Sequence, residues 1–299
     1  LDLSGGSSGG VIVSVDGNDL SGIINFIGDG SADQINIING NFTLGSNQSL
    51  NNIEIIKLSQ SNTAQDITIK GETSGIEVFE GTVNSSSVED DGVIFSGSRD
   101  FSNITLKNID ELTLADGFST RQTLGINANS NFGLTEIEDF ATGSVSTSDI
   151  FDYKSNLVSG NGTLVSSDVD LNLNSISSGD RSTDIISANN TAVLEFEANK
   201  LTIDITSSSD SQITDAVEEL LESVNASSNL TGTTSAVKEG GINTDTLLIF
   251  HEADNDAVII RYQEGSTSEA DFNGELSVVA IFDTLAHSGS DLFENTNIV

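Results

Sequence analysis

The sequence predicts a mostly β protein, with an N-terminal β-solenoid-like or β-sandwich domain followed by a β-rich domain with one amphipathic helix. Three observations indicate this fold. Short runs of alternating apolar and polar residues recur along the 299 residues, separated by Gly, Asn, Asp and Ser. The chain contains no proline, which would remove a donor from a β-ladder. Apolar residues follow a helical spacing convincingly in one segment alone.

The first ten residues are rich in glycine and serine, and we expect a flexible segment there, before a first domain over residues 11–130. Within this domain β-type runs recur about every 10 to 20 residues, a spacing typical of stacked β-coils, sandwiches and barrels. Alternation in most runs predicts one buried and one solvated face. The runs are residues 11–13, 23–27, 35–38, 53–58, 67–69, 76–79, 93–95, 104–106 and 112–114.

An imperfect internal repeat favours the solenoid over the sandwich. Residues 49–58 and 101–114 both run from an Asn-Ile step into alternating apolar residues. In a solenoid each coil buries its apolar face only against its neighbours, and asparagine side chains can stack at the turns. Because the repeat has only two copies, the sandwich remains the alternative.

The second domain is expected over residues 131–299, after a polar segment at residues 127–133. A helix is predicted near residues 210–225, where Ser209 or Asp210 can cap the first turn. Its apolar face consists of Ile213, Val217, Leu220, Leu221 and Val224. The strands on either side of residues 254–256 are expected to form a hairpin. Strands are predicted at residues 163–165, 169–173, 192–197, 201–205, 246–251, 257–262 and 276–282.

The charge of the chain excludes several classes of partner. With 46 acidic and 10 basic residues the formal net charge is −36, and the basic residues are scattered. Nucleic acids and anionic membrane surfaces are therefore not expected as partners, because both are bound through clustered Lys and Arg. No apolar run reaches the roughly 18 residues of a membrane-spanning helix, so membrane insertion is not expected either. The absence of cysteine excludes disulfides and thiolate-bound metals.

The excess of acid also favours Ca²⁺ as a cofactor. Like charges destabilise a compact state, and carboxylate, amide and backbone oxygens are the ligands that Ca²⁺ prefers. We expect Ca²⁺ at loops where several such oxygens fall within a few residues. Two alternatives remain: the same residues are common turn formers, and salt can screen the charge. The candidate ligands are Asp16, Asn18, Asp19, Asp29, Ser31, Asp33, Asp168, Asp170, Asp180, Asp184, Asp254, Asn255 and Asp256.

Residues 26–37 (FIGDGSADQINI) resemble one turn of the RTX family, whose calcium-binding members are exported by type I secretion. That family repeats Gly-Gly-x-Gly-x-Asp-x-apolar-x in a parallel β-roll, and Asp29 stands here in place of the second glycine. Residues 134–143 with residues 149–151, and residues 245–299, are similar to C-terminal modules of the same family. The resemblance implies an extracellular, calcium-ordered bacterial surface protein without catalytic residues, and an export signal at the C-terminus.

Patterns typical of catalysis are weak. The two histidines, His251 and His287, are expected to be ordinary strand-edge or loop residues. No His-Glu-x-x-His zinc motif occurs. A carboxylate pair such as Asp90 and Asp91 could serve a glycosidase. The absence of Trp and the two Tyr residues leave few platforms for sugar stacking.

The leading hypothesis is a secreted bacterial structural protein that self-assembles into a surface layer, sheath or filament. Calcium would neutralise carboxylates within and between subunits, so that like-charged copies could pack as a homo-oligomer or polymer. The alternative is a calcium-dependent adhesin module that binds a cell-surface glycan. A hydrolase acting on polysaccharide comes third, and we expect no enzyme activity.

Overall fold

The structure is a computed structural model in which the chain divides into two compact units. The first comprises Leu1–Asp116 with Asn129–Glu138, and the second Gly117–Ala128 with Asp139–Val299, whereas the sequence placed a single boundary after residue 130. The residues that the structure describes are 2, 10–22, 25–29, 32–60, 63–83, 91–115, 120–127, 135–142, 146–154, 157–158, 164–165, 173–176, 193–196, 201–227, 245–252, 256–263, 274–283, 285–287, 293 and 298.

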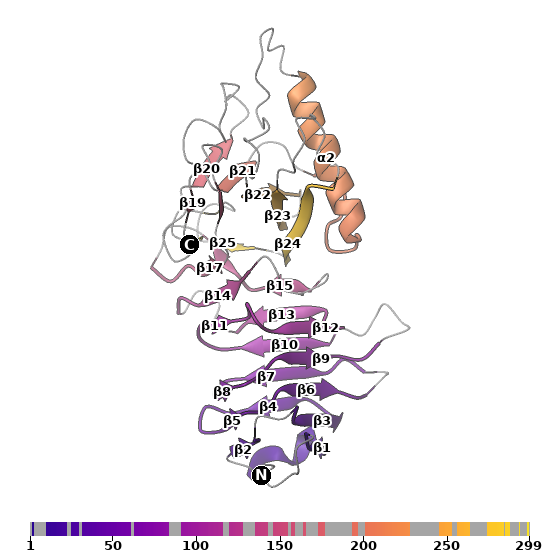
Figure 1. The fold of residues 1–299 in the computed structure, drawn as a ribbon, viewed down its shortest axis with the longest axis vertical. Coiled ribbons are helices and arrows are strands. Elements are labelled where there is room, and N and C mark those ends of the chain that lie inside the picture. The colour runs from indigo at the N-terminus through magenta and orange to yellow at the C-terminus, as the bar shows by residue number, and fades with distance from the viewer. Residues whose placement is uncertain are drawn as a thin grey trace. The chain divides into compact units, whose positions relative to one another are not determined.

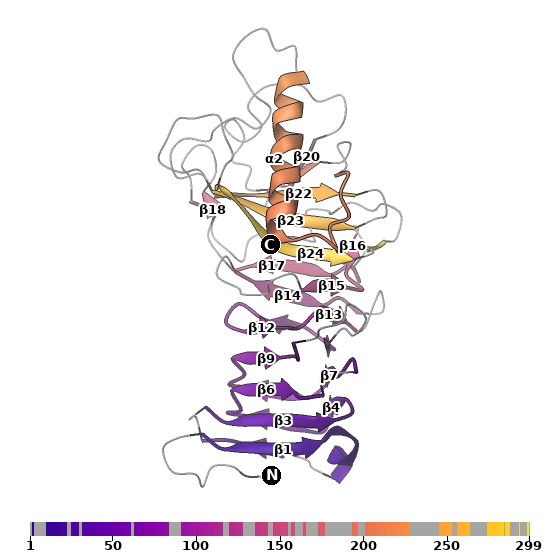
Figure 2. The ribbon, with the colours of Figure 1, turned by 90° about the vertical axis from the view of Figure 1, so that its right-hand side faces the viewer.

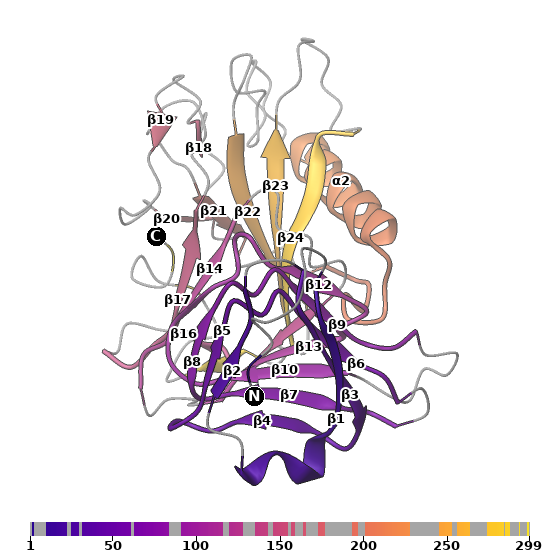
Figure 3. The same ribbon diagram turned by 60° about the horizontal axis from the view of Figure 1, so that its bottom comes forward.

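The first unit is a parallel β-solenoid of about five turns, which confirms the solenoid that the internal repeat favoured over a sandwich. Its strands stack on three faces around a common core, as Figures 1 and 3 show. The first face, which faces the viewer in Figure 2, consists of β1 (Ile12–Asp16), β3 (Gln34–Asn39), β6 (Ile55–Leu58), β9 (Val78–Glu80) and β12 (Thr105–Lys107). The second consists of β4 (Phe42–Leu44), β7 (Asp66–Ile69), β10 (Gly92–Phe95), β13 (Glu111–Leu114) and β15 (Glu136–Glu138). The third consists of β2 (Asn25–Ile27), β5 (Ser49–Asn51) and β8 (Glu72–Ser74), and β11 (Arg99–Asp100) follows β10 in the next coil.

Apolar side chains form columns inside the solenoid because the strands stack in register. On the first face Ile35 is paired with Ile56, Ile56 with Phe79, and Phe79 with Leu106. These four side chains are at most 4% exposed, while the residues beside them in each strand face outward. Each coil therefore buries its apolar face against its neighbours, as the alternation predicted.

A short 3₁₀-helix, η1 (Gly17–Gly22), follows β1 in the first coil. It contacts β1, β3 and β4. Leu20, at 5% exposed, enters the end of the core, and its carbonyl oxygen accepts a hydrogen bond from Gln48 Nε2 at 3.4 Å. The helix thus covers the N-terminal end of the stack.

The two copies of the sequence repeat form equivalent corners of two different coils of the solenoid. Asn52 and Asn108 have left-handed backbone conformations, with φ of 53° and 52°, which asparagine tolerates better than most residues. Each precedes a buried isoleucine and then an acid, Glu54 or Asp110. The carboxylate of that acid accepts a backbone hydrogen bond from the preceding coil, at 2.7 Å for Glu54 and 3.0 Å for Asp110.

The second unit combines further strands with one α-helix among the residues described. Strands β22 (Asp245–His251), β23 (Ala257–Gln263) and β24 (Leu276–Asp283) are antiparallel, and β22 and β23 form the predicted hairpin. The strand β14 (Thr123–Ile126) pairs in parallel with β17 (Ile150–Tyr153). The shorter strands are β16 (Ala141–Thr142), β18 (Leu157–Val158), β19 (Leu164–Val165), β20 (Leu173–Ile176), β21 (Val193–Phe196) and β25 (Ala286–His287).

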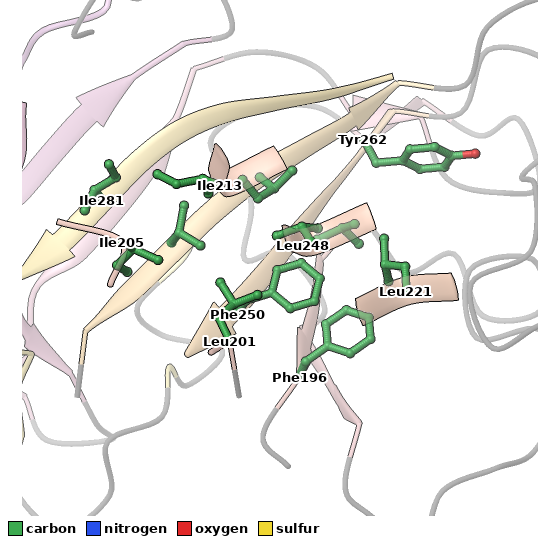
Figure 4. Close-up of a cluster of buried hydrophobic side chains, with 12 residues drawn as sticks. Phe196, Leu201, Ile205, Ile213, Leu221, Leu248, Phe250, Tyr262 and Ile281 are labelled. Carbon is green, nitrogen blue, oxygen red and sulfur yellow. The ribbon is translucent and has the colours of Figure 1, made fainter. Parts of the chain in front are cut away.

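The helix α2 (Asp210–Ser227) confirms the prediction near residues 210–225. Its buried face, with Ile213, Val217 and Leu221, packs on apolar side chains of β21, β22, β23 and β24 (Figure 4). Phe196 and Phe250 stack beneath it with ring centroids 4.5 Å apart. This cluster is the hydrophobic core of the hairpin and helix.

The strand predicted at residues 201–205 is wrong, because these residues form bends before the helix. Leu201 and Ile205 are buried in the helix core, at 5% and 0% exposed. The backbone N–H of Ile205 donates to Glu252 Oε2 at 2.8 Å rather than to a ladder. Asp204 Oδ1 accepts the N–H of Ser207 at 3.1 Å, which stabilises a turn. The apolar residues thus fill the core without continuing a strand.

Candidate functional site

The first predicted calcium loop folds as a turn held by its own side chains. Asp16 Oδ1 accepts hydrogen bonds from the N and Nδ2 of Asn18, at 2.9 and 3.0 Å, and Asp16 Oδ2 accepts one from Asn39 Nδ2 at 3.0 Å. The bond from Asn39, followed by that from the Asn18 backbone, lowers the pKa of Asp16 below its ordinary value. Asp19 lies in η1 and is exposed. Calcium binding at this loop remains a prediction.

The two described residues of the RTX-like loop have different surroundings. Asp29 is exposed, whereas Asp33 is 0% exposed. Asp33 Oδ1 accepts the N–H of Val11 at 2.7 Å, and Asp33 Oδ2 accepts the N–H of Asp29 at 2.9 Å. The buried carboxylate therefore closes the loop on itself and connects it to the preceding coil.

The remaining candidate ligands are mostly beyond the described ranges. Asp256 precedes β23 and is 8% exposed, and its carbonyl oxygen accepts the N–H of Glu252 at 3.0 Å. Within the ranges given above, no group of three or more His, Asp or Glu side chains is placed to hold a metal ion. The candidate calcium ligands that fall outside the described residues are Ser31, Asp168, Asp170, Asp180, Asp184, Asp254 and Asn255.

Two further buried aspartates repeat the arrangement of Asp33. Asp91 Oδ1 accepts the N–H of Gln65 at 2.9 Å, and its Oδ2 accepts the N–H and hydroxyl of Thr82 at 2.6 and 2.9 Å. Asp149 accepts the N–H groups of Gln122 and Ala141, both at 2.8 Å. We call Asp33, Asp91 and Asp149 the loop-clamp aspartates. Each directly precedes a strand, and all three are 0% exposed.

Sequence reasoning missed the role of the loop-clamp aspartates. It considered Asp91 as half of a glycosidase pair, but Asp91 is buried and engaged by backbone donors. The sequence does contain a local signal for these loops. Gly28 stands at the start of the loop that ends at Asp33, and Gly81 stands at the start of the loop that ends at Asp91. A Cβ at Gly28 would lie 1.8 Å from Asn52 O, and one at Gly81 would lie 1.9 Å from Asn108 O. Both glycines are therefore required by the close approach of the next coil.

The outward side of the first face carries a short row of alternating charges. Glu80 Oε1 accepts hydrogen bonds from Lys57 Nζ at 2.7 Å and from Lys107 Nζ at 3.0 Å, across neighbouring strands. Burial raises the pKa of Glu80, but the two lysines together outweigh it and lower the pKa below its ordinary value. Such partly exposed pairs stabilise a fold only modestly.

Among the described strands, β1 is paired only with β3, so its other edge, at the N-terminal end of the solenoid, has no strand partner there. β1 is the last strand of the first face, and its outward Ile12 is 63% exposed. The other large apolar residues with high exposure in the described parts of the chain are Ile27, Ile38 and Val83, at 39%, 52% and 80%. Three of the four thus belong to the first two coils.

A cavity of about 260 Å³ opens into the solenoid core at the third face. It lies where β8 and β11 follow one another in successive coils without pairing. Arg99, at its rim, donates from Nη2 to Gly71 O at 2.8 Å. Burial lowers the pKa of Arg99, and the charge of Glu72 acts in the opposite direction. The apolar lining includes Ile69, Ile76, Phe79, Val93, Phe101 and Ile104.

In the second unit, His251 and Glu195 form a buried pair. His251 Nε2 and Glu195 Oε1 share a hydrogen bond of 2.8 Å, with the residues 2% and 0% exposed. The same Oε1 accepts the backbone N–H of Phe293 at 3.0 Å. The pair holds residue 293 near the end of the chain and has no access to solvent.

Comparison with known proteins leaves the chain without an assigned family. No family model matches it, and no curated protein and no solved structure is similar enough to count as a match. Among the helices that the structure describes, none has the length and hydropathy needed to cross a membrane.

Proposed function

We propose that this chain is an extracellular structural protein of a bacterium that assembles with copies of itself into a layer, sheath or filament. The edge of β1 that has no partner among the described strands carries this proposal. β1 has β3 on one side and ends the order β1-β3-β6-β9-β12, and its outward Ile12 is 63% exposed. Terminal strands of this kind add strands from another chain through backbone hydrogen bonds.

The distribution of exposed apolar residues supports association at this end. Ile12, Ile27 and Ile38 all belong to the first two coils, and Val83 is the exception among the residues described. Copies with a net charge of −36 repel each other. Contact between them is most favourable where apolar surface is buried, which is at the N-terminal end of the solenoid.

Calcium is proposed as the ion that reduces this repulsion. The support comes from the charge of the whole chain and from the resemblance of residues 26–37 to a calcium-binding RTX turn. Asp16, Asp19 and Asp29 are at the N-terminal end of the solenoid and are accessible enough to receive an ion there. The same resemblance supports secretion and a surface location.

The test measures the assembly state of the purified chain in Ca²⁺ and in EGTA, by light scattering and by negative-stain electron microscopy. We expect assemblies in Ca²⁺ that dissolve in EGTA. Ile12→Lys should weaken them, and Val83→Lys is the matched control because it adds the same charge at an exposed apolar site outside the first two coils. A chain that stays monomeric in Ca²⁺ at high concentration, or equal assembly by both variants, refutes the proposal.

A further inference from the structure

The cavity in the third face originates in one column of inward-facing residues. Phe26 of β2 is paired with Leu50 of β5, and Leu50 with Thr73 of β8. Phe26 and Leu50 are 1% and 0% exposed and fill the core, whereas the smaller Thr73 lines the cavity. The column therefore loses volume at the third coil, at the point where the ladder of this face stops. Figure 1 locates β8 and β11 on either side of this interruption.

The lining and size of the cavity suit a small apolar molecule. Aliphatic and phenyl side chains from both of the other faces surround it, including Phe79 of β9 and Val93 of β10. An apolar cavity of roughly 150 Å³ is known to stay dry and to bind benzene. The present cavity differs from that case, because it opens to solvent and because Thr73, Ser98, Arg99 and Asp100 add polar groups to its lining. At about 260 Å³ it has room for a body of two fused rings or a short acyl chain.

Arg99 supplies one unused polar group. Its Nη2 donates to Gly71 O, but its Nε is buried and has no hydrogen-bond partner in the structure. A buried guanidinium N–H without an acceptor is costly, so an acceptor on a ligand would be favoured at this atom.

The charges at the rim select the kind of acceptor. Glu72 of β8 is exposed and its charge acts on Arg99. Asp100 of β11 is exposed and lines the cavity beside Arg99, and its Oδ1 accepts the N–H of Ser102 at 2.9 Å. Two carboxylates beside one guanidinium give the rim a net negative charge. A carboxylate ligand would meet this charge as well as the −36 of the whole chain, whereas a carbonyl oxygen accepts the same hydrogen bond without repulsion.

We infer that the cavity binds a small, uncharged, apolar molecule with one carbonyl acceptor, such as a ketone, ester or lactone. The apolar body contacts the side chains that line the cavity, including Thr73, Phe79 and Val93. The carbonyl oxygen accepts the hydrogen bond from Arg99 Nε. This site is independent of assembly at β1, so either can fail without the other.

Three fluorescent probes of nearly equal shape test the inference on the full chain: 2-acetylnaphthalene, 2-ethylnaphthalene and 2-naphthoate. Non-specific adsorption favours the more hydrophobic ethyl compound, so a preference for the acetyl compound reports the hydrogen bond. We expect one site per chain, with 2-acetylnaphthalene bound about fivefold more tightly than 2-ethylnaphthalene, and 2-naphthoate bound most weakly. Tighter binding of the ethyl compound or of the carboxylate overturns the ligand class.

Variants locate the site. Arg99→Met removes the donor and should abolish the preference for the acetyl compound. Thr73→Phe restores the large residue that Phe26 provides two coils earlier, so it should abolish binding of all three probes while the chain stays folded by circular dichroism. Ser74→Phe adds the same ring on the exposed side of β8 and should leave binding unchanged. If Thr73→Phe binds the probes like the unmodified chain, the site is elsewhere and the inference is wrong.

Discussion

Replacing Asp91 by alanine tests whether the loop-clamp aspartates hold the solenoid together. The substitution removes an acceptor of three hydrogen bonds, from the N–H of Gln65 and from the N–H and hydroxyl of Thr82, at a site that is 0% exposed. A hydrogen bond to a charged group contributes about 1.5–3 kcal/mol, and a buried donor left without a partner costs about 1–3 kcal/mol. Because these terms overlap, we expect a loss of about 3–5 kcal/mol.

Asp91→Asn should lose about 2 kcal/mol, because one amide oxygen still accepts while the NH₂ group faces a donor. Asp100→Ala is the matched control, since this exposed aspartate accepts one local bond from Ser102, and it should lose less than about 1 kcal/mol. Urea unfolding followed by circular dichroism gives the free energies, and hydrogen exchange reports the protection of the Gln65 amide. If Asp91→Ala unfolds at the same urea concentration as the unmodified chain, with Gln65 still protected, the clamp is not what stabilises these coils.

Three further predictions concern the helix, the charged row and a close backbone contact. Ser209→Ala removes the side-chain half of a reciprocal cap, in which Ser209 Oγ accepts the Gln212 N–H at 3.4 Å and donates to Gln212 Oε1 at 2.9 Å, and it should cost about 1 kcal/mol in thermal unfolding. Glu80→Gln should cost at most about 1 kcal/mol at pH 7. Since the folded-state pKa of Glu80 is lowered, this contribution is present above the pKa of the unfolded chain and is lost as pH falls through the folded-state value. The two chains should therefore unfold alike in strong acid and in high salt, and a difference that persists in both would contradict the ion pair. Gly81→Ala would place a Cβ 1.9 Å from Asn108 O and should cost about 2 kcal/mol or more by chemical unfolding, whereas an unchanged midpoint would show that the coil can move.

The alternation of apolar residues predicted the strands because it is a local property with a period of two. The helix was equally legible, since Ile213, Val217 and Leu221 share one face within three turns. The strand at residues 201–205 was mispredicted for the opposite reason. Leu201 and Ile205 are apolar because they pack against α2, which is a tertiary contact that local alternation does not reveal.

The roles of the acidic residues could not be predicted from the sequence. Asp33, Asp91 and Asp149 accept hydrogen bonds from donors 22, 26 and 27 residues earlier, and the aspartate of a turn has the same local sequence whether it clamps a loop or binds an ion. The cavity was hidden as well. It depends on the register that places Thr73 beside Leu50, and loops of unequal length obscure that register in the sequence.

The loop-clamp aspartates separate the length of a loop from the geometry of the coil that carries it. The second donor precedes its aspartate by 4 residues for Asp33, 9 for Asp91 and 8 for Asp149, yet each carboxylate makes the same pair of connections. Residues between donor and aspartate can therefore be added, removed or exchanged while the stack beneath is unchanged. The solenoid therefore provides a constant scaffold for loops that differ in length and sequence. New surface residues can be introduced in the loop at one corner while the other corners stay unchanged.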